Sequence, residues 1–111
     1  MESQQAEQLI GQLQMYNQQL QNIIIQRQAL SVQSREIEKA LEEIEKSGDD
    51  IYRSIGPVLI RVEKEKLRKD LHDEKEEIDV KEKTLEKQEN RLKEKVNEIQ
   101  EKFQQTPGTG G

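Results

Sequence analysis

The residues whose side chains could perform acid–base or metal chemistry are few and poorly placed for it. The chain has a single histidine, His72, followed by Asp73, and it has no cysteine. A His–carboxylate pair can bind a metal or move protons, but neighbouring residues of a helix point in different directions. The Glu and Asp clusters of the second half lack the spacing and the glycine of a calcium loop, and no glycine-rich phosphate loop occurs. The sequence therefore predicts no catalytic residue, no metal site and no cofactor, and we expect a protein that is not an enzyme.

The side chains best suited to a function lie in one apolar segment, IYRSIGPVLIRV, at residues 51–62. β-Branched and aromatic residues flank Gly56 and Pro57, which predicts two strands joined by a tight turn. The hairpin carries seven large apolar side chains on its two faces, and a pair of helices offers no face wide enough to cover them. The alternative, a hairpin folded onto its own helices, is disfavoured for that reason. Since burying each side chain is worth about 1.5–3 kcal/mol, we expect an assembly module that joins the hairpins of other subunits. Its residues are Ile51, Tyr52, Ile55, Gly56, Val58, Leu59, Ile60 and Val62.

Composition and charge narrow the class of protein further. Hydrophobic residues make up 31% of the chain and charged residues 37%, which suits the narrow apolar seam of a coiled coil better than a layered core. The net charge of −5, with both signs interleaved, leaves no basic surface for nucleic acid or an anionic membrane. No segment approaches the roughly 20 apolar residues of a membrane span, and the first residues lack the features of a signal peptide. We expect a soluble, cytoplasmic protein without nucleic-acid or membrane partners.

Apolar residues recur in heptads on both sides of the hairpin. Alternating steps of four and three residues lead from Leu9 to Ile44, and a seven-residue repeat leads from Leu71 to Ile99. Such repeats predict coiled-coil helices. Gly48 is expected to end the first helix as a left-handed cap. The predicted organisation is an N-terminal coiled-coil helix over 1–48, the hairpin module over 49–63, a C-terminal coiled-coil helix over 64–105 and a disordered tail over 106–111.

The two helices are expected to pair with each other in antiparallel orientation. When facing residues are matched so that their numbers have a constant sum, the layers nearest the termini are apolar on both sides and the chain reverses at Gly56. In this register Arg27 lies on the diagonal from Glu89, as an ion pair that can set the register. The predicted fold is therefore mainly α: a long antiparallel two-helix coiled coil with one β-hairpin at the helix–helix connection, which joins an intersubunit β-barrel.

Four stretches together resemble a known family. A Gln-rich first helix, the acidic run LEEIEKSGDD, the segment IYRSIGPVLIRV and the charged stretch LEKQENRLKEKV are similar to the β-class subunit of prefoldin, most of all in its archaeal form. The resemblance implies a hexamer of two α-class and four β-class subunits, whose hairpins form a double β-barrel that carries six coiled-coil arms. It also implies an ATP-independent holdase chaperone that captures unfolded polypeptides and passes them to a group II chaperonin.

Client capture is expected at the distal end of the arm, where helices fray and seam residues become partly uncovered. Met15 and Ile10 lie off the seam there, and methionine adapts to many partners. The expected client-binding residues are Leu9, Ile10, Leu13, Met15, Tyr16, Val96, Ile99 and Phe103. Further residues off the seam could form an inner client surface or contact a neighbouring subunit's helices: Ile24, Ile25, Val32 and Val80. The alternative function is a structural coiled-coil adaptor that oligomerises through its hairpin and binds one defined folded partner.

Overall fold

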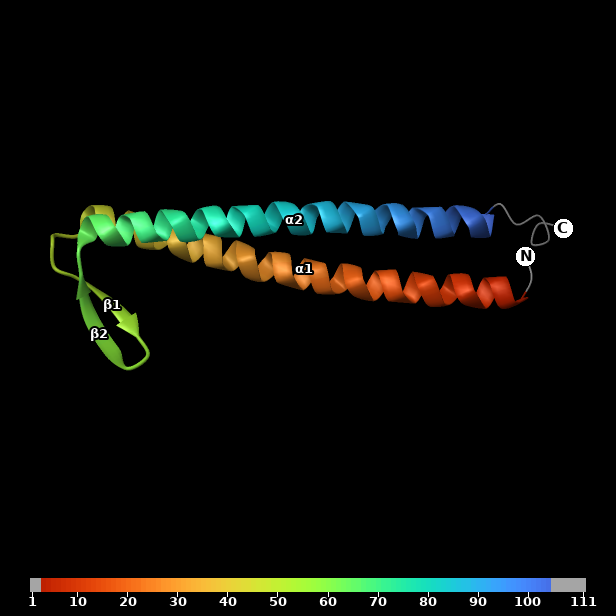
Figure 1. Cartoon of the computed structure of the whole chain (residues 1–111), viewed down its shortest axis with the longest axis horizontal. Coiled ribbons are helices and arrows are strands. Elements are labelled where there is room, and N and C mark those ends of the chain that lie inside the picture. Colours follow the sequence, from red (N-terminus) through yellow and green to blue (C-terminus); the bar gives the residue numbers. More distant parts are fainter. Residues whose placement is uncertain (1–2, 105–111) are drawn as a thin grey trace. The chain divides into compact units, whose positions relative to one another are not determined.

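The computed structural model describes residues 3–104 and contains two long helices with a two-stranded hairpin between them in the chain (Figure 1). The elements follow in the order α1 (Ser3–Lys46), β1 (Ile51–Ile55), β2 (Val58–Val62) and α2 (Lys64–Gln104). The predicted mainly α fold with one hairpin is thus confirmed. The tail predicted to be disordered, 106–111, lies outside the described residues. Within residues 3–104, no helix is long and apolar enough to cross a membrane.

The chain divides into two compact units, and both helices contribute to each of them. We call residues 28–82, which include the hairpin, the hairpin unit. The described residues 3–27 and 83–104 form the arm unit. In each unit α1 and α2 pack along an apolar seam and run in opposite directions.

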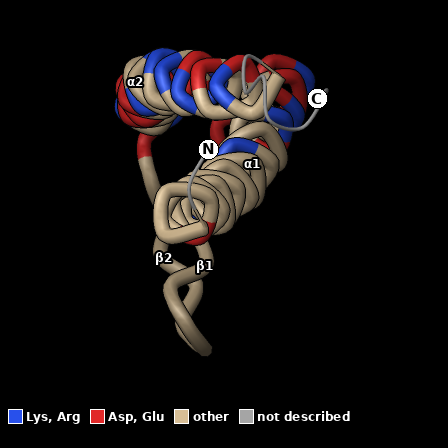
Figure 2. Tube along the Cα trace, turned by 90° about the vertical axis from the view of Figure 1, so that its right-hand side faces the viewer, with Lys and Arg blue, Asp and Glu red and all other residues tan. Residues whose placement is uncertain are grey.

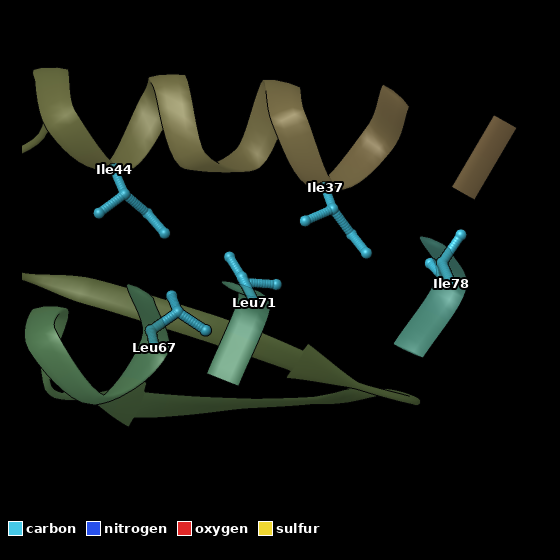
Figure 3. Packing of buried hydrophobic residues seen from close by; sticks show 5 residues of the cluster. All are labelled: Ile37, Ile44, Leu67, Leu71 and Ile78. Atoms are coloured by element: carbon cyan, nitrogen blue, oxygen red, sulfur yellow. The ribbon is translucent and has the colours of Figure 1, made fainter. Parts of the chain in front are cut away.

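A small aliphatic core holds the hairpin unit together (Figure 3). Its buried members come from both helices: Ile37, Ile44, Leu67, Leu71 and Ile78. Partly buried side chains surround them, and two of these, Ile51 and Val62, belong to the hairpin. Ion pairs bracket this seam, including Lys75 Nζ to Glu38 Oε1 at 2.9 Å. This bond to Glu38 raises the pKa of Lys75 above its usual value.

The end of α1 differs from the prediction. Among the described residues only Gly56 has a positive φ, so the expected left-handed cap at Gly48 is wrong. Ser47 closes the helix instead: its hydroxyl donates to the Glu43 carbonyl at 2.7 Å, and its backbone N–H donates to the Ile44 carbonyl at 3.2 Å. The Lys64 ammonium then donates to the Ser47 carbonyl at 2.9 Å. Ser47 thus satisfies two of the last carbonyls of the helix, one through its hydroxyl and one through its backbone N–H, without a left-handed residue.

The start of α2 is tied to the end of α1 through one guanidinium. Arg68 Nε lies 2.8 Å from Glu45 Oε1 of α1, and its Nη1 also pairs with Glu65 one turn earlier on α2. The hydrogen bond from Arg68 lowers the pKa of Glu65. The two helix ends are thereby joined beside the point where the hairpin leaves them.

The turn of the hairpin depends on a glycine. Gly56 and Pro57 form a two-residue loop between the paired residues Ile55 and Val58. Gly56 has φ +56°, and the proline that follows has a fixed negative φ, which is the pattern of a type II′ turn. A Cβ added at Gly56 would meet no atom within 4 Å, so only the backbone conformation demands glycine here.

Gly56→Ala is therefore expected to destabilise the hairpin modestly, by about 1–2 kcal/mol, because alanine is strained at positive φ while meeting no clash. Urea titration of the assembled protein should show the loss. Gly48→Ala serves as the matched control and should leave the midpoint unchanged or slightly raised, since Gly48 has no positive φ. Equal losses for both variants would contradict the assignment of strain to the turn.

The arm unit is held together by an apolar seam between its own stretches of α1 and α2. Ile23 and Ile99 are buried, and the remaining predicted seam residues of this unit are half-buried, apart from buried Glu89. The predicted pairing of Arg27 with Glu89 is confirmed, with Arg27 Nη1 2.6 Å from Glu89 Oε2. The Lys93 ammonium lies 3.9 Å from the same oxygen. The buried carboxylate of Glu89 is thus neutralised by two nearby cationic side chains.

Candidate assembly and binding surfaces

The strand register divides the hairpin into two unlike faces. Residues directly opposite each other share a face, and the pairs run from Ile51 with Val62 at the base to Ile55 with Val58 at the turn. The face that includes these pairs we call the inner face; it consists of Ile51, Arg53, Ile55, Val58, Ile60 and Val62. The outer face consists of Tyr52, Ser54, Leu59 and Arg61. The inner face is apolar except for Arg53. The outer face combines two large apolar side chains, Tyr52 and Leu59, with two polar ones, Ser54 and Arg61.

The base of the inner face packs on the chain's own helices. Ile51 and Val62 are half-buried against the aliphatic core of the hairpin unit. Further along the strand, Arg53 Nη2 lies 3.2 Å from Glu74 Oε1 of α2. The expectation that all the large apolar side chains of the hairpin stay uncovered is therefore wrong for two of them. The reason is that the strands start beside the core and turn their inner face towards α2.

The remainder of the hairpin stays uncovered. Five large apolar side chains are between 44% and 69% exposed, with Leu59 the most exposed: Tyr52, Ile55, Val58, Leu59 and Ile60. We call these five the hairpin strip. They occupy both faces of the sheet: Ile55, Val58 and Ile60 lie on the inner face, and Tyr52 and Leu59 lie on the outer face. On the outer face, an exposed ion pair joins Arg61 to Asp50 at 3.0 Å. A contiguous group of this kind is typical of a protein–protein interface.

The predicted client-binding residues all lie in the arm unit, and the structure sorts them by exposure. Ile10 and Met15 are 46% and 47% exposed, as expected for residues off the seam. Ile99 is only 3% exposed, so the expectation that it is partly uncovered is wrong. It is a seam residue packed between the helices, and nearness to the chain end does not open the seam there. The other predicted residues are half-buried: Leu9, Leu13, Tyr16, Val96 and Phe103.

The apolar residues to which the sequence assigned no single role are all exposed. Ile24 and Ile25 belong to the arm unit, and Ile25 is 63% exposed. Val32 and Val80 belong to the hairpin unit. None of the four takes part in the seam, which is why heptad spacing alone did not explain them.

No arrangement for catalysis emerges from the described residues. His72 and Asp73 are both exposed. Within residues 3–104, no group of three His, Cys, Asp or Glu side chains could hold a metal ion. The charged groups instead form ion pairs on and beside the seam, and the apolar surfaces are suited to binding other polypeptides.

Comparison with known proteins agrees with this geometry. Residues 7–109 match the family of prefoldin subunits. The chain is also similar to the crystal structure of the prefoldin beta subunit from Thermococcus strain KS-1, with 35% sequence identity, a TM-score of 0.81 and coverage of 90% of each chain. Among curated proteins, no sequence matches.

Proposed function

Because the chain belongs to the prefoldin subunit family, we propose that it is a β-class subunit of a hetero-oligomeric, ATP-independent holdase. Prefoldin subunits are chaperones without enzymatic activity. In this proposal the chain assembles with α-class subunits into a hexamer of two α-class and four β-class chains in the cytoplasm. The complex captures unfolded polypeptides and passes them to a group II chaperonin. The observation that carries the proposal is the exposed hairpin strip on a chain of this family.

The assembly part of the proposal is supported by the energetics of the hairpin strip. Its five side chains are exposed in the single chain, and burying each of them is worth about 1.5–3 kcal/mol. The anchored base fixes where the strip lies relative to the core of the hairpin unit. Free strand edges also offer unpaired N–H and C=O groups to strands of other chains. These features favour a sheet or barrel shared between subunits over a lone protomer.

The capture part is supported by the exposed apolar residues of the arm unit. Ile10 and Met15 are exposed near the start of α1, and half-buried neighbours such as Leu13 and Phe103 adjoin the surface. Each contact with an unfolded chain is weak. Several arms in one complex can nevertheless hold a client through their high effective concentration.

Shortening the arm tests this proposal. Deletion of residues 1–8, together with truncation after Ile99, is expected to leave the number of subunits in the complex unchanged. We expect about tenfold more complex to be needed to suppress aggregation of a chemically unfolded client, because each arm loses contacts that act multivalently. Light scattering at the client's refolding temperature measures the protection, and size-exclusion chromatography with multi-angle scattering measures the mass.

The outcomes separate the two candidate functions. Full protection by a shortened complex with the same number of subunits would contradict distal capture and favour the adaptor that binds a defined folded partner. A complex that falls apart on shortening would show that the arm ends contribute to assembly instead. Deletion of the tail alone, residues 106–111, is the matched control and should alter neither measurement.

A further inference from the structure

The two helices of the arm unit differ sharply in charge. Between Glu7 and Arg27, α1 has no charged residue, and its polar residues are Gln and Asn. In contrast, α2 from Lys83 onwards carries Lys, Arg and Glu along its exposed side, so that it is banded red and blue in Figure 2 while most of α1 is tan. The arm therefore presents one neutral and one strongly charged helix.

The exposed apolar residues follow the same division. Four large apolar side chains of the arm unit are exposed, and all of them belong to α1: Ile10, Met15, Ile24 and Ile25. On α2, the apolar residues from 83 to 104 are buried or half-buried in the seam: Leu85, Leu92, Val96, Ile99 and Phe103. The apolar surface available to a partner thus lies on α1 alone. Three of the four, Ile10, Ile24 and Ile25, lie within about 100° of one another around α1, and we call these three and the amides around them the neutral face.

The amides of the neutral face suit one kind of occupant. A glutamine or asparagine side chain has both donors and an acceptor, as the peptide group does. Exposed Gln14, Asn17 and Gln21 can therefore bond to the N–H or the C=O of an extended backbone. Because the neutral face carries no charge, it is expected to bind acidic and basic segments equally well.

The spacing of the apolar residues also fits an extended segment. Ile10 and Ile24 are two heptads apart and share one side of α1, so about 21 Å separates them at 1.5 Å per residue. An extended chain advances roughly 3.3 Å per residue, so a segment of about seven residues spans both. Ile25 lies about 60° around the helix from Ile10 and widens this surface, whereas Met15 lies on the opposite side of α1 from Ile24.

We propose that the neutral face of α1 binds extended apolar segments of unfolded polypeptides regardless of their charge, and that α2 keeps the arm hydrated without contacting them. This inference rests on the proposed function and deepens it, because it assigns capture to one helix of the arm. It also gives Ile24 and Ile25 a role in binding, well inside the chain from its N-terminus.

Paired substitutions of equal size test the assignment. In the assembled complex, Ile24→Ser with Ile25→Ser removes apolar surface from α1. The control, Lys87→Ser with Glu94→Ser, changes two exposed residues of α2 and leaves the net charge unaltered. The probes are two fluorescent peptides of equal apolar content, one acidic and one basic, whose binding is followed by anisotropy.

The wild-type complex is expected to bind both peptides with affinities that change less than about twofold between roughly 0.05 and 0.5 M salt, where charge contacts would weaken strongly. The α1 variant should bind both about tenfold more weakly, which corresponds to the loss of two partly buried aliphatic contacts. The α2 control should bind them as the wild type does.

Other results would overturn the inference. Equal loss in the α1 variant and the α2 control would show that capture is not confined to α1. A preference for one peptide that disappears at high salt would show that charge governs binding. A third result would be a wild-type complex that binds neither peptide but associates with itself as its concentration rises, while the α1 variant does not. The occupant of the neutral face would then be a second copy of the chain. Protection of clients by the α1 variant at wild-type level refutes only this inference, whereas a wild-type complex that protects no client refutes the proposed function as well.

Discussion

Ile60→Asp is expected to dissociate the complex into smaller species while their helices remain folded. Ile60 belongs to the hairpin strip and is 44% exposed in the single chain, so aspartate is tolerated there before assembly. In a shared sheet or barrel the same carboxylate would be buried without a partner, at a cost of several kcal/mol. A cost of that size weakens association at least about a hundredfold.

The change can be measured directly by multi-angle light scattering of the co-expressed complex, with far-UV circular dichroism to follow the helices. Ile25→Asp is the matched control: it makes the same chemical change at an exposed isoleucine of the arm unit and should leave the mass unaltered. An Ile60→Asp complex of wild-type mass would contradict a shared sheet. Loss of helicity along with mass would instead mean that Ile60 stabilises the protomer.

The second large effect concerns the polar layer of the arm unit. Arg27→Leu is expected to destabilise the arm by about 2–3 kcal/mol, because it leaves the Glu89 carboxylate buried without its main partner. Glu89 is only 8% exposed, and Lys93 at 3.9 Å can replace Arg27 only in part. Replacing both residues, Arg27→Leu with Glu89→Leu, should recover most of the loss, since an apolar pair suits the seam.

Thermal unfolding of the wild type, of Arg27→Leu, of Glu89→Leu and of the double variant, followed by circular dichroism, gives the interaction between the two residues as a double-mutant cycle. The exposed pair of Lys46 with Glu43 offers a comparison, because Lys46→Leu should change stability by less than about 1 kcal/mol. If Arg27→Leu and the double variant are equally unstable, the ion pair does not account for the loss, and packing of the arginine stem does.

The sequence predicted the seam well because its period is a physical constraint of helix pairing. Steps of four and three residues from Leu9 to Ile44 identify positions that all prove buried or half-buried. The ion pair between Arg27 and Glu89 was predictable for the same reason, since an antiparallel register fixes which seam residues lie near each other. The hairpin followed from the Gly-Pro turn between two apolar runs.

Other features depend on three-dimensional placement that periodicity does not encode. Strand composition predicts a hairpin but not the direction in which it leaves the helices, so the burial of Ile51 and Val62 was missed. The bond from Arg53 to Glu74 was missed too, although an arginine within an apolar strand face is itself a signal that an acidic partner lies opposite. Nearness to the chain end does not predict the exposure of Ile99, because this side chain is buried in the seam between the helices. The sequence does not predict that the exposed apolar surface of the arm unit lies on α1 alone, because this depends on the burial of each apolar side chain of α2.

The anchoring of the hairpin base has a thermodynamic consequence. Ile51 and Val62 share one core with Ile37, Ile44 and Leu71, so the strands and the adjoining helical turns gain their order together. A partner that binds the hairpin strip also favours the state in which that core is intact, and it stabilises these turns by mass action. If the hairpin strip is shared between subunits as proposed, dilution of the protein is expected to loosen these helical turns together with the hairpin.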